Sequence, residues 1–242
     1  MRVLFLIISL SIAIFAADPL PMVNLSVSAL EEPAQFVKTI NIAIILALLV
    51  LAPSLLLMVT SFTRIVIVLS LLRQAMGLQQ TPPTQIIISL ALIMTIFIME
   101  PYGKKAWDEA IVPYMDEQIS YQDAFSKGVA PFKDFMIKNT RESDLALFYR
   151  IKKESNPKNI DEVSLTLLMP AFIVSELRTA FEIGFLIFLP FLIIDIIVAS
   201  ILMSLGMMML PPVMISLPIK IIFFIVVDGW LLLLGNIAQS FK

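Results

Sequence analysis

The sequence predicts an all-α, multi-helix integral membrane protein with a small helical soluble insertion. Hydrophobic residues make up 59% of its 242 residues, and the mean hydropathy is +0.95. Charged residues account for only 15%, against roughly a quarter in soluble domains. Apolar runs long enough to cross a bilayer lie on both sides of one charged block.

The 17 basic and 19 acidic residues are unevenly placed along the chain. Residues 101–163 hold 21 of them, residues 39–99 hold only Arg64 and Arg73, and residues 164–242 hold seven. This order predicts a first membrane helical block at 40–100, a helical insertion at 101–163, and a second membrane helical block at 164–242.

The composition also excludes several classes of function. Cysteine and histidine are absent, so disulfides, Cys/His zinc sites and catalysis by either side chain are ruled out. A net charge of −2 gives no basic surface for nucleic acid. We therefore expect no enzyme activity, no cofactor, no metal site and no nucleic-acid partner.

The first 39 residues form two segments of different character. Arg2, the apolar run at 3–15 and the small pair Ala16-Ala17 predict a signal peptide at 1–17. The alternative is an uncleaved N-terminal anchor. Residues 18–39 carry prolines and acids, and we expect a loose periplasmic segment there.

In the first membrane block, residues 40–72 predict one long apolar helix with a kink at Pro53. At 1.5 Å per residue it would be about 50 Å long, more than the roughly 30 Å hydrocarbon core. Arg64 inside it needs a partner or a cavity, or else lies at headgroup level. A second apolar helix at 85–99 is expected to end at Pro101 and Gly103.

The insertion shows helical spacing of apolar residues, for example around 124–132 and 145–149. Its paired acids have no convergent partners and indicate solvated helix faces. The loop that precedes residue 85 carries Arg73 and no acid, which favours the cytoplasm and places the insertion in the periplasm. Hydropathy then predicts four membrane spans.

The second membrane block begins with about 40 apolar residues at 165–205, which include Pro190. One straight helix of this length would be about 60 Å long. The helix therefore either folds back near Pro190 or extends well beyond the lipid. A final helix is expected at 219–234.

Apart from Lys242 at the end, this block holds six ionisable residues, which are costly there unless they pair inside protein: Glu176, Arg178, Glu182, Asp195, Lys220 and Asp228. Arg178 and Glu182 are four residues apart and can pair on one helix face. If the chain folds back, Glu176 can meet Lys220, within or between subunits. If the helix is continuous, Asp195 is the better partner of Lys220. The alternative is that all six are headgroup-level charges.

Met207, Met208 and Met209 follow Gly206 and precede two prolines. Three consecutive methionines cannot share one helix face, but methionine is flexible and fills irregular gaps. Repeated around a ring, they could form an apolar seal that blocks water and ions by dewetting. The alternative is an ordinary lipid-facing turn.

Three segments resemble signatures of the flagellar biosynthetic protein FliP family. They are residues 170–185 (PAFIVSELRTAFEIGF), residues 218–220 (PIK) with 228–230 (DGW), and residues 61–64 (SFTR) through 80–83 (QTPP). Two long motifs in the right order make the resemblance specific, and it covers most of the chain from residue 40.

The resemblance implies a core subunit of the flagellar type III protein export gate, located at the basal body in the bacterial inner membrane. Several copies would assemble with the partner proteins FliQ and FliR, and unfolded substrates would pass through. The methionine-rich loop of the family maps onto Met207, Met208 and Met209 as a pore gasket. Virulence secretion homologues are similar, and the signal peptide and insertion favour the flagellar branch.

A secondary transporter for a small solute or an ion is the alternative function. Asp195, Lys220 and Asp228 would then form its coupling site. Such transporters commonly show internal repeats and broken helices. This sequence has helices interrupted by proline but no convincing repeat, which favours the gate subunit.

Overall fold

A computed structural model describes residues 40–47, 50–51, 57–78, 80–155, 157, 159, 162–207 and 210–241. The predicted signal peptide (1–17), the predicted loose segment (18–39), Met208 and Met209 lie outside these residues. The chain divides into two compact units, Met1–Ala52 and Pro53–Lys242. The described residues of the first unit are helical, and the following paragraphs concern the second unit.

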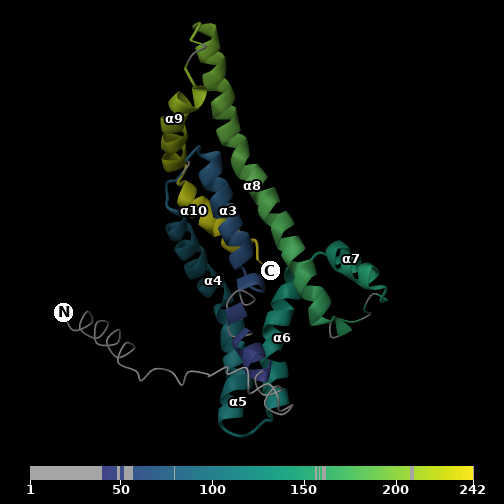
Figure 1. The fold of residues 1–242 in the computed structure, drawn as a ribbon. Helices are drawn as coiled ribbons and strands as arrows, with labels where there is room; N and C mark the ends of the chain where they lie inside the picture. Colours follow the sequence, from purple (N-terminus) through teal and green to yellow (C-terminus); the bar gives the residue numbers. More distant parts are fainter. Residues whose placement is uncertain are drawn as a thin grey trace, which may run out of the picture. The chain divides into compact units, whose positions relative to one another are not determined.

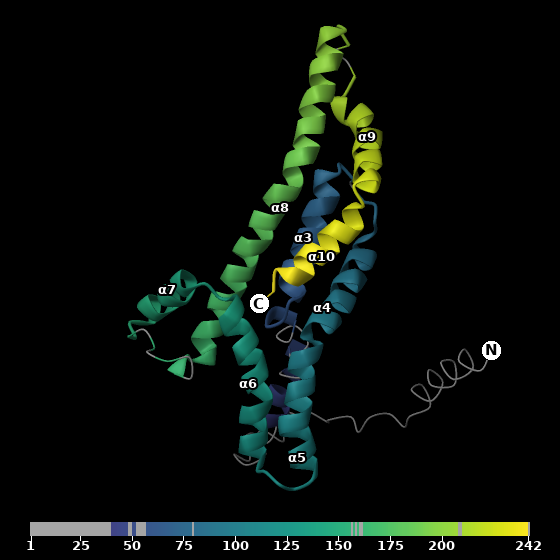
Figure 2. The same ribbon diagram turned by 180° about the vertical axis from the view of Figure 1, so that it is seen from behind.

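The described residues of the second unit form helices and no strands, which confirms the predicted all-α class (Figures 1 and 2). The elements are α3 (Phe62–Ala75), α4 (Thr84–Ala106), a π-helical turn η2 (Trp107–Ile111), α5 (Val112–Met115), α6 (Tyr121–Asn139), α7 (Glu142–Lys152), α8 (Leu165–Ser204), α9 (Pro212–Val226) and α10 (Gly229–Gln239).

Two segments of the described chain are long and apolar enough to cross a membrane, Thr84–Met115 and Leu165–Ser204. Helices α9 and α10 meet the same criterion only as a pair, and this pair is bent by 65°. The described residues therefore offer two membrane-spanning helices, or three if the bent pair counts as one span.

Helix α8 packs against α3, α6, α7 and α9 along its length. It runs for 40 residues without a break through Pro170 and Pro190, about 60 Å at 1.5 Å per residue. The chain therefore does not fold back at Pro190, and of the two predicted alternatives the continuous helix is confirmed. Gly184 lets α3 approach closely, because a Cβ atom there would lie 2.2 Å from Leu71 Cδ1.

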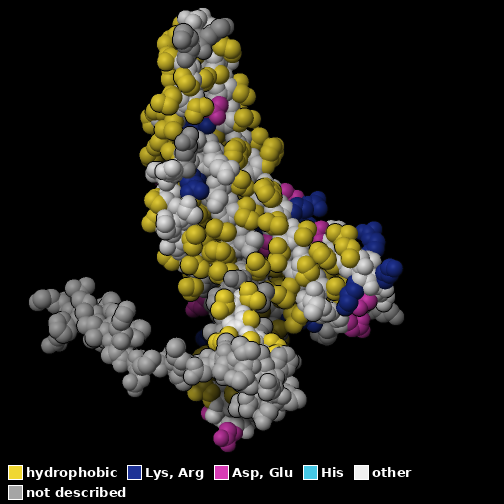
Figure 3. Space-filling model, viewed as in Figure 1, with side chains coloured by type: hydrophobic (Ala, Val, Ile, Leu, Met, Phe, Trp, Pro, Cys, Tyr) yellow, Lys and Arg dark blue, Asp and Glu magenta, His cyan; other side chains and the backbone are white. Residues whose placement is uncertain are grey.

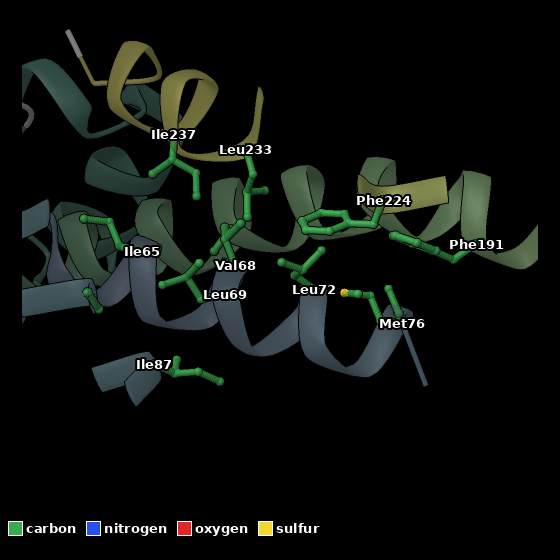
Figure 4. Packing of buried hydrophobic residues seen from close by; sticks show 13 residues of the cluster. Ile65, Val68, Leu69, Leu72, Met76, Ile87, Phe191, Phe224, Leu233 and Ile237 are labelled. Carbon is green, nitrogen blue, oxygen red and sulfur yellow. The ribbon is translucent and has the colours of Figure 1, made fainter. Parts of the chain in front are cut away.

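The main hydrophobic core lies where α3 meets α8, α9 and α10 (Figure 4). Helix α3 contributes a buried stripe at helical spacing, made of Ile65, Val68, Leu69 and Leu72. The facing side chains are Phe191 of α8, Phe224 of α9, and Leu233 and Ile237 of α10. Between helices in an apolar surrounding, such contacts stabilise the fold by van der Waals packing.

A second core joins α4, α6 and the beginning of α8. Phe135 of α6 is fully buried in it and contacts the rings of Tyr102, Phe172 and Phe241 edge-on or stacked. The predicted helical insertion thus consists of the end of the α4–α5 segment together with α6 and α7. Both α6 and α7 pack on α8.

Three predicted helix boundaries are wrong. The helix expected over 40–72 is interrupted, because residues 59–61 form a turn before α3 begins at Phe62. The Thr60 hydroxyl donates to the carbonyl of Leu57 and accepts from the amide of Phe62, so it replaces helical hydrogen bonds with local ones.

Helix α4 does not end at Pro101 and Gly103 but continues to Ala106 and, through η2, to Met115. Met99 and Tyr102 pack in the second core on either side of Pro101, and this packing holds the helix through the proline. The final helix predicted at 219–234 is instead two helices, since α9 ends at Val226 and α10 starts at Gly229.

Candidate functional site

Two clusters of charged side chains lie in apolar surroundings, one near each end of α3. Helix α8 supplies the acid of both clusters, Glu176 in one and Asp195 in the other. The basic partners come from different helices, Arg64 from α3 and Lys220 from α9.

The first cluster is built on the pair Arg64–Glu176, whose side chains are 3% and 0% exposed. Arg64 Nε donates to Glu176 Oε2 over 2.8 Å, and Arg64 Nη2 donates to Glu176 Oε1. Two parallel bonds of this kind between a guanidinium and a carboxylate are strong and fix the geometry of both groups.

The rest of the Arg64 guanidinium is also satisfied. Nη1 donates to the carbonyl oxygen and the hydroxyl of Ser240 over 2.8 and 2.9 Å, and Nη2 donates to Asn139 Oδ1 over 3.4 Å. All five N–H groups of the guanidinium therefore have an acceptor. The ring of Phe241 covers its face, 3.9 Å from Cζ. The cluster thus ties together α3, α6, α8 and the residues that follow α10.

A hydrogen-bonded link through Ser175 continues this cluster toward α7. Ser175 is buried beside Glu176 on α8, accepts from the amide of Arg141 over 3.0 Å, and donates to Asp144 Oδ2 over 2.7 Å. Asp144 lies in the first turn of α7. The link therefore attaches the start of α7 to α8.

An exposed ion cluster lies one to two turns further along α8. Arg141 donates two hydrogen bonds to Glu182, over 3.1 and 2.6 Å, and Arg178 Nε donates a third over 3.3 Å. The predicted contact between Arg178 and Glu182 is confirmed. The hydrogen bond to Glu182 raises the pKa of the Arg141 guanidinium, because it stabilises the charged form.

The second buried cluster is built on Lys220 and Asp195. Lys220 Nζ donates to Asp195 Oδ2 over 2.6 Å and to the carbonyl of Ala75 over 3.1 Å. The hydroxyl of Ser216 donates to Asp195 Oδ1 over 2.6 Å. Because Ala75 is the last residue of α3, the ammonium also meets the negative end of that helix dipole.

The two clusters decide between the predicted charge pairs. Within the chain Glu176 binds Arg64 and Lys220 binds Asp195, so the predicted intrasubunit pair Glu176–Lys220 is wrong. Its alternative, Lys220 with Asp195 on a continuous α8, is confirmed. The reason is depth, since Glu176 and Asp195 are 19 residues apart on one unbroken helix, about 28 Å. A contact between Glu176 and Lys220 of different subunits stays a prediction.

The predicted burial of the four other charges, Arg178, Glu182, Asp195 and Asp228, does not hold within the single chain. Arg178, Glu182 and Asp228 are exposed in the single chain, and Asp195 is partly exposed. Arg64 was not among the predicted site residues, although it is the centre of the first cluster. The sequence shows Arg64 as a lone cation inside an apolar helix, which indicates that it needs a partner. The neighbouring sequence does not identify Glu176 as that partner.

A hairpin without charge lies beyond the second cluster. We call residues 196–219 the apical hairpin: the last turns of α8, the connection that follows, and the first turns of α9. No charged side chain occurs among these 24 residues. Many of its apolar side chains are exposed, including Ile197, Ile201, Met203, Leu205 and Met214. Figure 3 shows hydrophobic side chains over most of the visible surface of α8 and α9.

Of the predicted gasket, Met207 is described and Met208 and Met209 are not. Met207 follows the end of α8 in the connection of the apical hairpin, where it is 42% exposed. An exposed methionine at this place is compatible with a seal and also with the alternative turn, so the gasket stays a prediction.

A corner of 65° separates α9 from α10. Asp228 adopts a left-handed backbone (φ 51°) at the corner and is exposed. A Cβ atom on Gly229 would lie 2.2–2.7 Å from ring atoms of Phe224, and Trp230 packs edge-on against the same ring. Glycine is therefore required where the chain turns.

Two apolar hollows of about 550 and 460 Å³ flank this corner, and both are lined by Leu72 and Phe224. Asp228 lies two helical turns beyond Lys220 and outside the second cluster, so the three residues of the predicted transporter site are not assembled. Among the described residues, no three acidic side chains come together as a metal site.

Comparison with known proteins gives consistent matches over most of the chain. The model of the FliP family matches residues 45–237. The flagellar biosynthetic protein FliP of Bacillus subtilis (strain 168) is 50% identical over 211 residues, which cover 87% of this chain and 96% of that protein. The protein of the same name from Aquifex aeolicus (strain VF5) is 46% identical over 230 residues, 94% of this chain and 95% of its own length.

Proposed function

Because this chain belongs to the FliP family, we propose that it is a core subunit of the flagellar type III protein export gate. Several copies, together with FliQ-type and FliR-type partners, form a protein-conducting pore in the bacterial inner membrane at the flagellar basal body. Unfolded substrates pass through this pore. The subunit contributes steric and hydrophobic gating and no catalysis.

The observation that carries this proposal is the uncovered apolar surface of α8 and the apical hairpin. At about 60 Å, α8 is roughly twice as long as the hydrocarbon core is thick. Apolar side chains are exposed from Phe181 to Leu205 of this helix. Lipid alone covers only part of such a surface. Neighbouring subunits that pack along the helix would cover the rest, as an assembly of several copies requires.

In the proposed pore the methionine-rich connection closes the channel. Met207, Met208 and Met209 lie in the sequence between α8 and α9, within an uncharged stretch, so a ring of copies would bring many flexible apolar side chains together. Such a constriction excludes water and ions without a tight polar fit. It also deforms to let a chain pass.

The first experiment measures the native mass of the gently extracted complex, expressed together with its neighbouring membrane proteins. We expect a ring of several copies that also contains the two small partner proteins. A monomer or a simple dimer would contradict the gate and would favour the secondary transporter.

A second experiment tests the gasket. We replace Met207, Met208 and Met209 together by Gly and measure ion leakage through the resting assembly in cells. Loss of the apolar bulk should raise leakage, and the matched triple replacement by Leu should keep it low. Leakage that stays at the wild-type level in the Gly variant would contradict a seal at these residues.

A further inference from the structure

The apical hairpin has a polar fastening at its base. Asp195 and Lys220 are the charged residues that flank its 24 uncharged residues on either side. Although they are 25 positions apart in sequence, they bind each other over 2.6 Å. The two legs of the hairpin are therefore joined by charge at the level where α3 ends.

The fastening holds the hairpin to α3 as well as to itself. Lys220 also donates to the carbonyl of Ala75, at the end of α3, and Ser216 donates to Asp195. The hydroxyls of Ser200 and Ser204 instead bind carbonyls of their own helix over 2.8 Å. Among the described residues, the polar side-chain contacts that link the two legs and α3 are those of Ser216 and Lys220.

The remaining contacts at this level are apolar. Val213 of α9 lies beside Gly77, in the turn after α3, and Val198 and Leu202 of α8 are buried. Apolar contact is non-directional, whereas hydrogen bonds weaken steeply with angle and distance. The first leg continues the unbroken helix α8, and the polar contacts add a directional constraint that holds the second leg, α9, to α8 and to the end of α3.

We propose that the Asp195–Lys220–Ser216 cluster, closed on the carbonyl of Ala75, is a fastening that fixes the apical hairpin relative to α3, and that the hairpin changes position when it opens. The side chain of Asp195 is 34% exposed in the single chain. Water or a neighbouring group can therefore compete for it from outside, which makes this cluster the one that can open.

This inference concerns the position of the hairpin and does not require that the protein forms a pore. Only its link to gating rests on the proposed function, because the hairpin carries the methionines of the proposed seal. Position and leakage are therefore measured separately.

The test is a distance measurement by pulsed EPR between spin labels. The chain contains no cysteine, so Ser204→Cys on the hairpin and Ser89→Cys on α4, both exposed, provide a unique pair. The labelled chain is diluted with unlabelled copies in the co-extracted complex. A second pair, Ser89→Cys with Gln122→Cys on α6, reports on the body of the unit.

The variants are Lys220→Met, which keeps the length of the side chain but removes its charge, and the double change Asp195→Asn with Lys220→Met. Ser200→Ala is the matched control, because its hydroxyl binds only its own helix in the described structure. We expect both Lys220 variants to broaden and shift the hairpin distance while the body pair and Ser200→Ala stay at the wild-type distribution.

An unchanged hairpin distance in the double variant would overturn the proposal. If Lys220→Met alone disturbs the body pair, the fold is damaged by the unpaired acid, and the double variant, which leaves no unpaired charge, decides. Ion leakage is then recorded for the same variants. If the hairpin moves and no leakage appears, the proposed gate is contradicted but the proposed fastening is supported. If leakage appears and the hairpin does not move, the proposed fastening is contradicted.

Discussion

The two charge clusters on α8 use the same kind of ion pair in opposite ways. Around Arg64 every guanidinium N–H has an acceptor, the carboxylate of Glu176 is fully buried, and Phe241 covers the cation. Around Lys220 two polar contacts and a partly exposed carboxylate remain. The first cluster is buried and fully hydrogen-bonded, and we take it as a fixed structural contact. The second is partly exposed, and it is the contact that we propose can open.

The difference follows from the desolvation of charge. A buried ion pair is retained without loss only if its geometry is good and its remaining hydrogen-bonding groups are satisfied. The Arg64 cluster meets this condition through four separate segments of the chain. The Lys220 cluster meets it at its inner side only, because the side chain of Asp195 is 34% exposed in the single chain. Four changes of decreasing effect test this contrast.

Arg64→Met should have the largest effect. It leaves Glu176 charged and unpaired in the interior, which costs about 3–5 kcal/mol of folding stability. Thermal unfolding of the detergent-extracted protein, together with its steady-state amount in membranes, measures the loss. The double variant Arg64→Met with Glu176→Gln should recover much of it. A double variant as unstable as the single one would show that the charge of Glu176 is not the cause.

Lys220→Met should be the next most severe change. It leaves Asp195 without its cation and the carbonyl of Ala75 without this donor, at a cost of about 1–3 kcal/mol. The exposed side of Asp195 keeps the cost below that of Arg64→Met, and the same unfolding measurement compares the two. If Lys220→Met destabilised the protein more than Arg64→Met, the Lys220 cluster rather than the Arg64 cluster would be the main structural contact, which would contradict this comparison.

Several features of the fold and of the charge pairs can be predicted from the sequence. The all-α class, the helical insertion and the pairing of Arg178 with Glu182 follow from charge placement and helical spacing. The pair Lys220–Asp195 was one of two alternatives and depended on whether α8 breaks at Pro190. A proline in a helix predicts a kink or a break, but α8 packs against α3, α6, α7 and α9 and is continuous.

The pair Arg64–Glu176 could not be predicted from the sequence, for a different reason. Its members lie 112 positions apart, and the depth of each helix relative to the other is set by side-chain packing. The corner at Asp228 was missed because it depends on a left-handed backbone and on the fit of Gly229 against Phe224. Residues 219–234 are apolar apart from Lys220 and the Asp228-Gly229 pair, and hydropathy alone favoured one helix across them.

Ser216→Ala sharpens the description of the second cluster. It removes one hydrogen bond to Asp195 but leaves Lys220 in place, so stability should fall by about 0.5–1.5 kcal/mol. Hydrogen exchange of the amides in residues 210–219 should speed up, while α3 stays protected. Uniform acceleration throughout the unit would mean that Ser216 supports the whole fold rather than the hairpin.

Arg178→Ala should have the smallest effect. Arg178 is exposed, and Glu182 keeps both of its hydrogen bonds to Arg141. Exposed pairs of this kind contribute little, and we expect an unfolding temperature indistinguishable from wild type. A clear fall in the unfolding temperature would indicate that this exposed cluster stabilises the fold together with the buried cluster around Arg64 and Ser175.

The closed cluster also has a consequence for the order of synthesis. When the ribosome has produced α3, neither Glu176 nor Ser240 exists yet, and Ser240 is 176 positions further along the chain. Until then the cation of Arg64 must stay in contact with water, with lipid headgroups or with the insertion machinery. Arg64 therefore gains its carboxylate partner only once α8 has been made, and the acceptors on Ser240 only at the very end of synthesis.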